Sequence, residues 1–303
     1  MTGVRRRVAA ALARWRLRRL FGRIAAHPGY TLVDSLAARA DRWHDRIAFA
    51  SPSGGPHAGR IAWGALFAAS QRVTRWAGQQ GLGRGARVGL MTPDPAATAI
   101  LALGLMRAGI VPVLYDSPAA GPELAAAIDR TAPALLVVGA DAAAGFEAAV
   151  SDLTHFCPVW RLGPDPGNYP SLDEALAALS DRPLTPRDLP RLSIDDPAIV
   201  LAGADGAILT ASTFSHGALR AGIEGAALTA SATGTAWQSD AGGRETGGSG
   251  TDRAGPAAPL RLLGSLAAMV SGATLAGDAS PGVPALGPTV VRIAGEFAAR
   301  RPT

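Results

Sequence analysis

Short apolar runs alternate with longer amphipathic segments through most of the 303-residue chain. The short runs have the length of strands, whereas the longer segments repeat their apolar residues at helical spacing. Strands that are buried on both faces and separated by crossover helices are typical of a parallel sheet. The pattern therefore predicts an α/β fold with a doubly wound, mostly parallel sheet. We expect strands at 87–91, 110–114, 134–138, 158–162 and 198–201, and helices at 63–78, 96–108, 122–130, 142–150 and 171–179.

The stretch DPAIVLAGADGAILTASTFSHGAL, at residues 196–219, is the candidate site. Ligands of doubly wound sheets bind beyond the carboxyl ends of the strands. The last predicted strand ends at Leu201, and Gly203 and Gly206 follow it. Glycine-rich loops whose backbone N–H groups converge are typical phosphate sites. We therefore expect a ligand-binding loop directly after Leu201.

Changes in composition divide the chain into four parts. Residues 1–28 form an arginine-rich extension, and residues 29–227 form the α/β domain. Residues 228–259 are rich in Gly, Ser, Thr and Ala and bury too little apolar area to offset their ordering entropy, so they are predicted to be a linker. Residues 260–303 are expected to add a short remnant, with one helix and a strand, and a Pro/Gly-rich tail.

The N-terminal extension has two opposed apolar faces. At 100° per residue, one face holds Val4, Val8, Leu12 and Trp15, and the other holds Leu17, Leu20, Phe21 and Ile24. We therefore expect a helix that is kinked or used in two halves. Arg14 interrupts the apolar stretch too early for a secretory signal. Residues 1–26 fit either a basic helix on an anionic membrane surface or a solvated extension.

The net charge of +5 comes from the N-terminus. All 29 basic residues are arginine, eight of them within residues 1–30, which leaves 21 arginines against 24 acidic residues in the rest. Because the body is mildly acidic, nucleic-acid binding is not expected. Cys157 is the single cysteine, and the five histidines lack metal-ligand spacing. We expect a cytoplasmic protein, with peripheral membrane contact as the alternative.

Several motifs occur in a recognisable order. YTLVDSLAARADRWHDRIAF begins at Tyr30, and GARVGLMTPDPAATAILALGLMRAGIVPVLYD follows. From Tyr30 to about Arg220, roughly two thirds of the chain, this order resembles the N-terminal part of the AMP-forming acyl-CoA synthetases, most closely the fatty-acid transport and very-long-chain branch. The resemblance implies the N-terminal α/β subdomain of that superfamily. It also implies adenylate-forming ligase chemistry, for which the family uses ATP, Mg²⁺ and CoA.

The resemblance identifies the phosphate-loop positions. The family motif T-S-G-T-T-G-x-P-K-G … S-H supplies hydroxyls, backbone N–H groups and a lysine to the ATP phosphates. The corresponding positions include Gly203, Asp205, Gly206, Thr210, Ser215 and His216. The family hydroxyls are replaced by alanine, glycine and aspartate, and its lysine falls on Thr210, or on Leu209 after a one-residue slip. These positions are therefore predicted to be a degenerate phosphate loop, in which Asp205 adds a charge of the wrong sign.

The later motifs also depart from the family. PLRLLGSLAAMVSGATL resembles P-L-x-H-x-x-G … G-A-T-L, with Leu262 at the histidine position. The sequence ends before the magnesium-linked glutamate motif and the C-terminal domain that carries the second catalytic lysine. We therefore expect a truncated, degenerate homologue. No catalytic residue, metal site or cofactor is assigned to it.

Two functions follow from these observations. The first is a pseudoenzyme without adenylation activity alone, which binds a long-chain acyl ligand or a protein partner that covers the incomplete fold. The alternative is an active fatty acyl-CoA ligase, or an adenylating subunit, that a separate chain completes. Fold alone does not decide between them.

Overall fold

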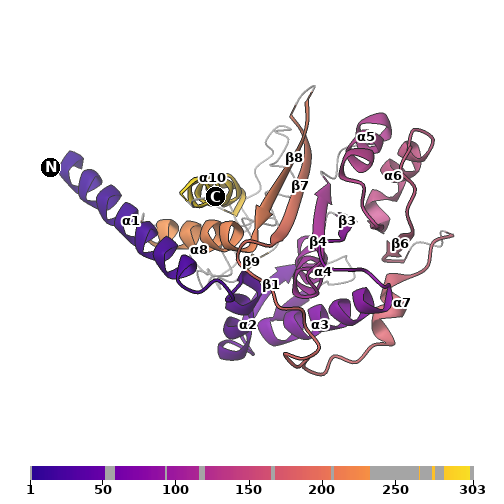
Figure 1. Cartoon of the computed structure of the whole chain (residues 1–303), viewed down its shortest axis with the longest axis horizontal. Helices are drawn as coiled ribbons and strands as arrows, with labels where there is room; N and C mark the ends of the chain where they lie inside the picture. Colours follow the sequence, from indigo (N-terminus) through magenta and orange to yellow (C-terminus); the bar gives the residue numbers. More distant parts are fainter. Residues whose placement is uncertain are drawn as a thin grey trace, which may run out of the picture.

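A six-stranded sheet lies at the centre of the computed structural model, which describes residues 2–51, 59–92, 94–115, 120–164, 168–205, 208–232, 266, 275–276 and 283–300. The strand order is β6-β5-β3-β4-β7-β8 (Figure 1). The strands are β3 (Arg87–Met91), β4 (Val111–Tyr115), β5 (Leu135–Gly139), β6 (Val159–Leu162), β7 (Pro197–Asp205) and β8 (Ile208–Ser215). Neighbouring strands are parallel except that β8 is antiparallel to β7. The mostly parallel α/β sheet predicted from the sequence is confirmed.

Alternate residues of the strands face two separate hydrophobic clusters. In β5, Leu135 and Val137 belong to one cluster, whereas Leu136 and Val138 belong to the other. The first cluster is covered by α2 (Leu32–Arg42), α3 (Trp63–Gln79), α4 (Pro95–Arg107) and part of α8 (His216–Ala232). The second is covered by α5 (Gly121–Thr131) and α6 (Ala143–Val150). Helices therefore cover both faces of the sheet, as a doubly wound fold requires.

A small second sheet has the strand order β2-β1-β9. Its strands are β1 (Ile47–Ser51), β2 (Gly59–Ala62) and β9 (Leu275–Ala276). The pairing of β1 with β9 joins segments that lie far apart in the sequence, and β9 is only two residues long. The sequence pattern did not predict this sheet because such short pairings carry little local signal.

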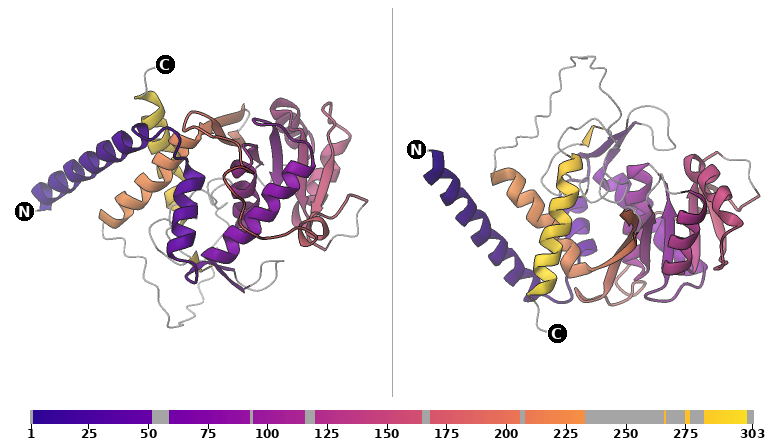
Figure 2. Two further views of the ribbon diagram at one scale, coloured as in Figure 1. Left: turned by 60° about the horizontal axis from the view of Figure 1, so that its bottom comes forward. Right: turned by 90° about the horizontal axis from the view of Figure 1, so that it is seen from above.

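Helix α1 (Thr2–Ala25) is one helix whose two halves have different surroundings, the second of the two expected arrangements. The side chains of Leu17, Leu20, Phe21 and Ile24 are buried against α8 and α10 (Val283–Ala299). The rings of Phe21 and Phe297 meet edge to face, with their centroids 5.3 Å apart. The second half of α1 is therefore part of the body, whereas its first half extends away from it (Figure 2).

The C-terminal part differs from the prediction. Residues 283–299 form α10, where we expected a Pro/Gly-rich tail. Val290, Ile293 and Phe297 recur at helical spacing and are buried, and their burial outweighs the unfavourable Pro288 within the helix. Most of the predicted linker at 228–259 lies outside the described residues, but α8 continues to Ala232. None of the helices in the described ranges is long and apolar enough to cross a membrane.

Candidate functional site

The segment after Leu201 is a β-hairpin, not a loop. Strand β7 continues to Asp205, and β8 returns from Ile208, with Gly203 paired to Thr210 and Asp205 paired to Ile208. Gly206 lies outside the described residues. The predicted end of the strand at Leu201 was therefore wrong. Glycine and aspartate favour turns, but here the backbone ladder with β8 keeps them extended.

The six predicted positions do not form one cluster. Gly203, Asp205 and Thr210 lie near the tip of the hairpin, at the carboxyl end of β7. Ser215 pairs instead with Pro197, at the amino end of β7. Gly203 lies six positions after Pro197 along β7, which is roughly 20 Å at the rise of an extended chain. Ser215 and His216 therefore lie at the opposite end of the hairpin from its tip. The assignment of the tip residues to phosphate binding remains a prediction.

Ser215 begins α8. Its side-chain oxygen accepts a hydrogen bond from the Ala218 N–H at 3.2 Å, the pattern of a helix N-cap. The next backbone groups are tied to the segment before β7, because the Gly217 N–H donates to the Ile194 carbonyl at 2.7 Å. A Cβ at position 217 would lie 3.0 Å from the Ile194 carbonyl oxygen, so the backbone is closely packed at this glycine. Ser215 therefore has a structural role in these contacts.

His216 is buried and neutral. Its side chain is 1% exposed, and its Nδ1 atom has no hydrogen-bond partner among the described residues. Burial lowers the pKa of His216 to about 4, although the nearby carboxylates of Asp196 and Asp34 favour its charged form. Its backbone N–H donates to the Asp196 carbonyl at 2.9 Å. A neutral imidazole in this position packs against the core and is inaccessible to a ligand at the hairpin tip.

Asp196 organises the start of β7. Its carboxylate accepts hydrogen bonds from the Arg84 guanidinium at 2.6 and 2.5 Å and from the Ser193 N–H at 2.6 Å. Burial raises the pKa of this carboxyl, but its hydrogen bonds to Arg84 and Ser193 and the charge of Arg84 outweigh that effect and hold the pKa below its usual value. Sequence reasoning missed Arg84 because it lies in a turn that is remote from the motif, with no local signal of its partner.

A cavity of about 610 Å³ lies beside α2 and the end of α4. Its lining includes Asp34, Arg107 and Arg191 together with leucine and proline residues of the segment before β7. Asp34 is already engaged, because it accepts from both the N–H and the hydroxyl of Thr31 at 2.7 Å. Arg107 lies over the ring of Phe67, 4.9 Å from its centroid, and burial lowers its pKa. Since β4 begins just after α4, this cavity is at the amino edge of the sheet, away from the hairpin tip.

The described strand residues of the hairpin lack the side-chain groups that the family motif supplies to a triphosphate. Triphosphate binding needs hydroxyl donors, a cation and free backbone N–H groups. The strand residues Gly203, Ala204 and Asp205 provide no hydroxyl, and their backbones pair with Thr210, Leu209 and Ile208. The chain contains no lysine at all. We therefore derive no reaction step through ATP or Mg²⁺ at this hairpin.

Comparison with known proteins agrees with the sheet order. Residues 36–201, more than half of the chain, match the family described as AMP-binding enzyme. The chain belongs to the AMP-binding enzyme family. A curated relative in sequence, sulfoacetate–CoA ligase of Cupriavidus necator, is 31% identical over 165 residues, which cover 54% of this chain and 31% of the relative. This member of the family therefore spans about one third of the length of that relative.

Solved structures show the same fold. A structure described as a long-chain-fatty-acid CoA ligase from Rhodopseudomonas palustris matches with a TM-score of 0.62 and 18% identity, covering 82% of this chain and 57% of that one. A benzoate CoA ligase from Burkholderia xenovorans matches with a TM-score of 0.53 and 16% identity, covering 62% and 35%. At these identities the matches show the fold only. The six-stranded sheet and its covering helices thus have the fold of these CoA ligases, and the predicted α/β architecture is confirmed.

Proposed function

We propose that this acyl/aryl-CoA ligase-like chain binds an acyl ligand or a partner but does not adenylate a carboxylic acid by itself. The β7–β8 hairpin carries this proposal. In its two strands, alanine, glycine and aspartate replace the hydroxyl residues of the family motif, and Thr210 or Leu209 replaces its lysine. Each missing charge-assisted hydrogen bond costs about 1.5 to 3 kcal/mol, so the losses together weaken triphosphate binding by orders of magnitude.

The ligand class of the proposal is a carboxylic acid. The named substrates of the similar proteins, sulfoacetate, benzoate and long-chain fatty acids, share a carboxylate. Within this class we favour a long-chain acyl group, on the resemblance of the motifs between Tyr30 and Arg220. A thermal melt with non-hydrolysable long-chain acyl and benzoyl adenylate analogues compares these ligands, because a ligand that binds the native state raises the melting temperature.

Pyrophosphate exchange tests the loss of activity. We expect the full chain to show no carboxylate-dependent exchange of pyrophosphate into ATP above the protein-free blank, with sulfoacetate, benzoate or palmitate as substrate. Robust exchange by the chain alone would overturn the proposal. Exchange that arises only after a second polypeptide is added would support the alternative of an adenylating subunit completed by a separate chain.

A gain-of-function variant tests whether the missing lysine is a cause of weak ATP binding. Thr210→Lys restores a cation at the family position, and Leu209→Lys does so in the alternative alignment. One of them should lower the dissociation constant for ATP by about 10- to 100-fold, because this factor corresponds to the free energy of one charge-assisted hydrogen bond. Ser212→Lys is the matched control, because it adds the same charge at an exposed position two residues further along β8. Equal effects at all three positions would contradict a specific role of the hairpin tip.

A further inference from the structure

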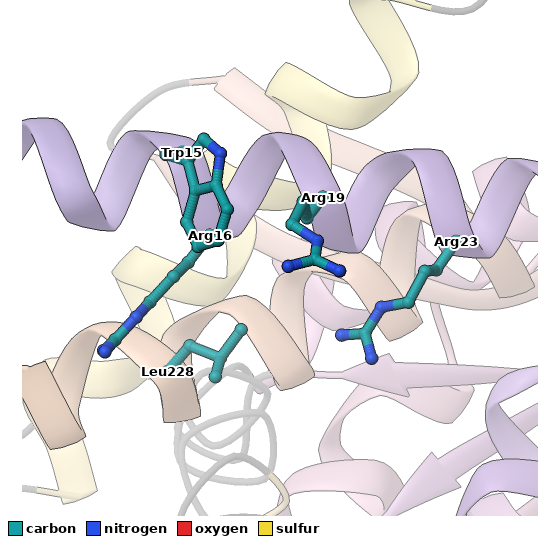
Figure 3. Close-up of a pocket in the computed structure, with 5 residues that line it drawn as sticks. All are labelled: Trp15, Arg16, Arg19, Arg23 and Leu228. Carbon is teal, nitrogen blue, oxygen red and sulfur yellow. The ribbon is translucent and has the colours of Figure 1, made fainter.

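The groove between α1 and α8 is lined by Trp15, Arg16, Arg19, Arg23 and Leu228 and encloses about 310 Å³. Figure 3 shows the three arginine side chains extending from α1 toward α8, with Leu228 on the opposite wall. The guanidinium of Arg19 lies 5.1 Å from the centre of the Trp15 ring. The groove therefore combines three cations with an aromatic and an aliphatic side chain.

These residues lie on one face of α1 by their spacing. Relative to Leu12, they stand at positions +3, +4, +7 and +11, which repeat on a single side of an α-helix. The opposite face, with Leu17 and Ile24, is buried in the body. Leu12 and Trp15 are 43% and 52% exposed. Helix α1 is therefore anchored by one face and presents a basic face with two exposed apolar side chains.

The charge of this face is not balanced locally. Within the described residues, the guanidinium groups of Arg16, Arg19 and Arg23 have no carboxylate partner. Residues 1–30 contain no acidic residue, whereas the rest of the chain has more acidic residues than arginines. The net positive charge of the chain is thus concentrated in α1, and such a concentration attracts an anionic surface.

We infer that the α1–α8 groove is a docking site for the head groups of anionic phospholipids at a membrane surface. Arginine pairs with phosphate and carboxylate groups through several N–H donors at once. Trp15 and Leu12 supply the apolar side chains that typically enter the interfacial layer beside such head groups. A mildly acidic body beside the groove disfavours a long polyanion such as nucleic acid, which would have to pass along that body. This inference does not depend on the proposed function.

Vesicle binding by charge variants of the full chain tests the inference. Deletion of α1 is unsuitable because it would also remove the buried Leu17, Leu20, Phe21 and Ile24. The groove variant is R16Q/R19Q/R23Q. The matched control is R42Q/R60Q/R187Q, which removes the same charge from exposed positions on the body. Both variants should melt at the temperature of the parent protein.

Co-sedimentation is measured with phosphatidylcholine vesicles, with and without phosphatidylserine, at low and high salt. We expect the parent protein to bind the phosphatidylserine vesicles and to be released by salt. Each arginine near an anionic surface raises the membrane partition coefficient about fivefold. The partition coefficient of the groove variant should therefore be about 100-fold lower than that of the parent protein, and that of the control variant should fall much less. Equal losses in both variants, or equal binding to vesicles without phosphatidylserine, would overturn the inference.

Two further measurements separate the sources of the signal. Brominated phospholipids should quench a component of the tryptophan fluorescence that Trp15→Phe removes, because Trp15 enters the interface. Unchanged quenching in that variant would count against the groove. Release of the protein from vesicles by double-stranded DNA at matched phosphate concentration, with the same loss in the groove variant, would assign the site to nucleic acid instead.

Discussion

The Arg84 guanidinium donates to both carboxylate oxygens of Asp196, at 2.6 and 2.5 Å. This pair joins the turn before β3 to the residue that precedes β7, two segments of the chain that sequence patterns treat as independent. The Ser193 N–H also donates to Asp196, and the Asp196 carbonyl accepts from the His216 N–H. One aspartate therefore fixes the amino end of β7 and the start of α8 together.

Asp196→Asn should lower the free energy of unfolding by about 1 to 2 kcal/mol, because it removes a charge-assisted pair whose arginine is half exposed. Since the pKa of Asp196 is held below its usual value, its contribution is present above the unfolded pKa and is lost as the pH falls through the folded pKa. Urea unfolding at neutral and acid pH measures both effects. Asp152→Asn, the same change at an exposed aspartate, should cost less.

His216 should make the protein less stable in mild acid. Its pKa is lowered from 6.5 to about 4, so the unfolded chain binds a proton first as the pH falls. Above pH 6.5 the neutral His216 does not lower the free energy of unfolding, and as the pH falls to 4 this free energy decreases by about 3 kcal/mol. His216→Gln should flatten the slope of unfolding free energy between pH 7 and 5. An unchanged slope in that variant would mean that another group titrates there.

Two glycines test the contact between α8 and α10. A Cβ at Gly222 would lie 2.5 Å from the Val290 carbonyl oxygen, whereas a Cβ at Gly295 would meet nothing within 4 Å. Gly222→Ala should therefore destabilise the protein by about 1 to 3 kcal/mol through overpacking. Gly295→Ala should stabilise it by about 0.5 to 1 kcal/mol through helix propensity. Equal melting temperatures for the two variants would contradict this packing of α10.

Cys157 should react slowly with thiol reagents. Burial raises the pKa of its thiol from 9.0 to about 11, so the thiolate fraction at neutral pH is about 100-fold lower than for a free cysteine. Iodoacetamide labelling in native buffer should be slower than in urea by at least that factor. Comparable rates in the two conditions would show that the thiolate is stabilised in the folded state.

The central sheet could be predicted from the sequence because each strand is a short buried run of apolar residues. Strand β3 has the predicted bounds, 87–91. Helix α3 (Trp63–Gln79) ends one residue later than predicted. These elements are fixed by local periodicity, which burial on both faces of the sheet preserves. The predicted membership of the AMP-forming superfamily was confirmed over residues 36–201, whereas the fatty-acid branch stays a prediction.

The elements that were missed depend on partners far away in the sequence. Strand β7 continues through Gly203 and Asp205 because β8 pairs with it, and neither residue type indicates a strand. Helix α10 forms although it contains Pro288, because Ile293 and Phe297 pack against α1 and α8. The predicted site residues lie in two places for the same reason. The pairing of β7 with β8 puts Ser215 opposite Pro197, far from Gly203.

Calorimetric titration of the purified full chain with Mg²⁺-ATP tests the central claim most directly. We expect no saturable binding at millimolar nucleotide, because alanine, glycine and aspartate replace the hydroxyl residues of the family motif and Thr210 or Leu209 replaces its lysine. Thr210→Lys or Leu209→Lys should then bring weak binding into range. Saturable binding by the unmodified chain, with a dissociation constant in the micromolar range, would contradict the account.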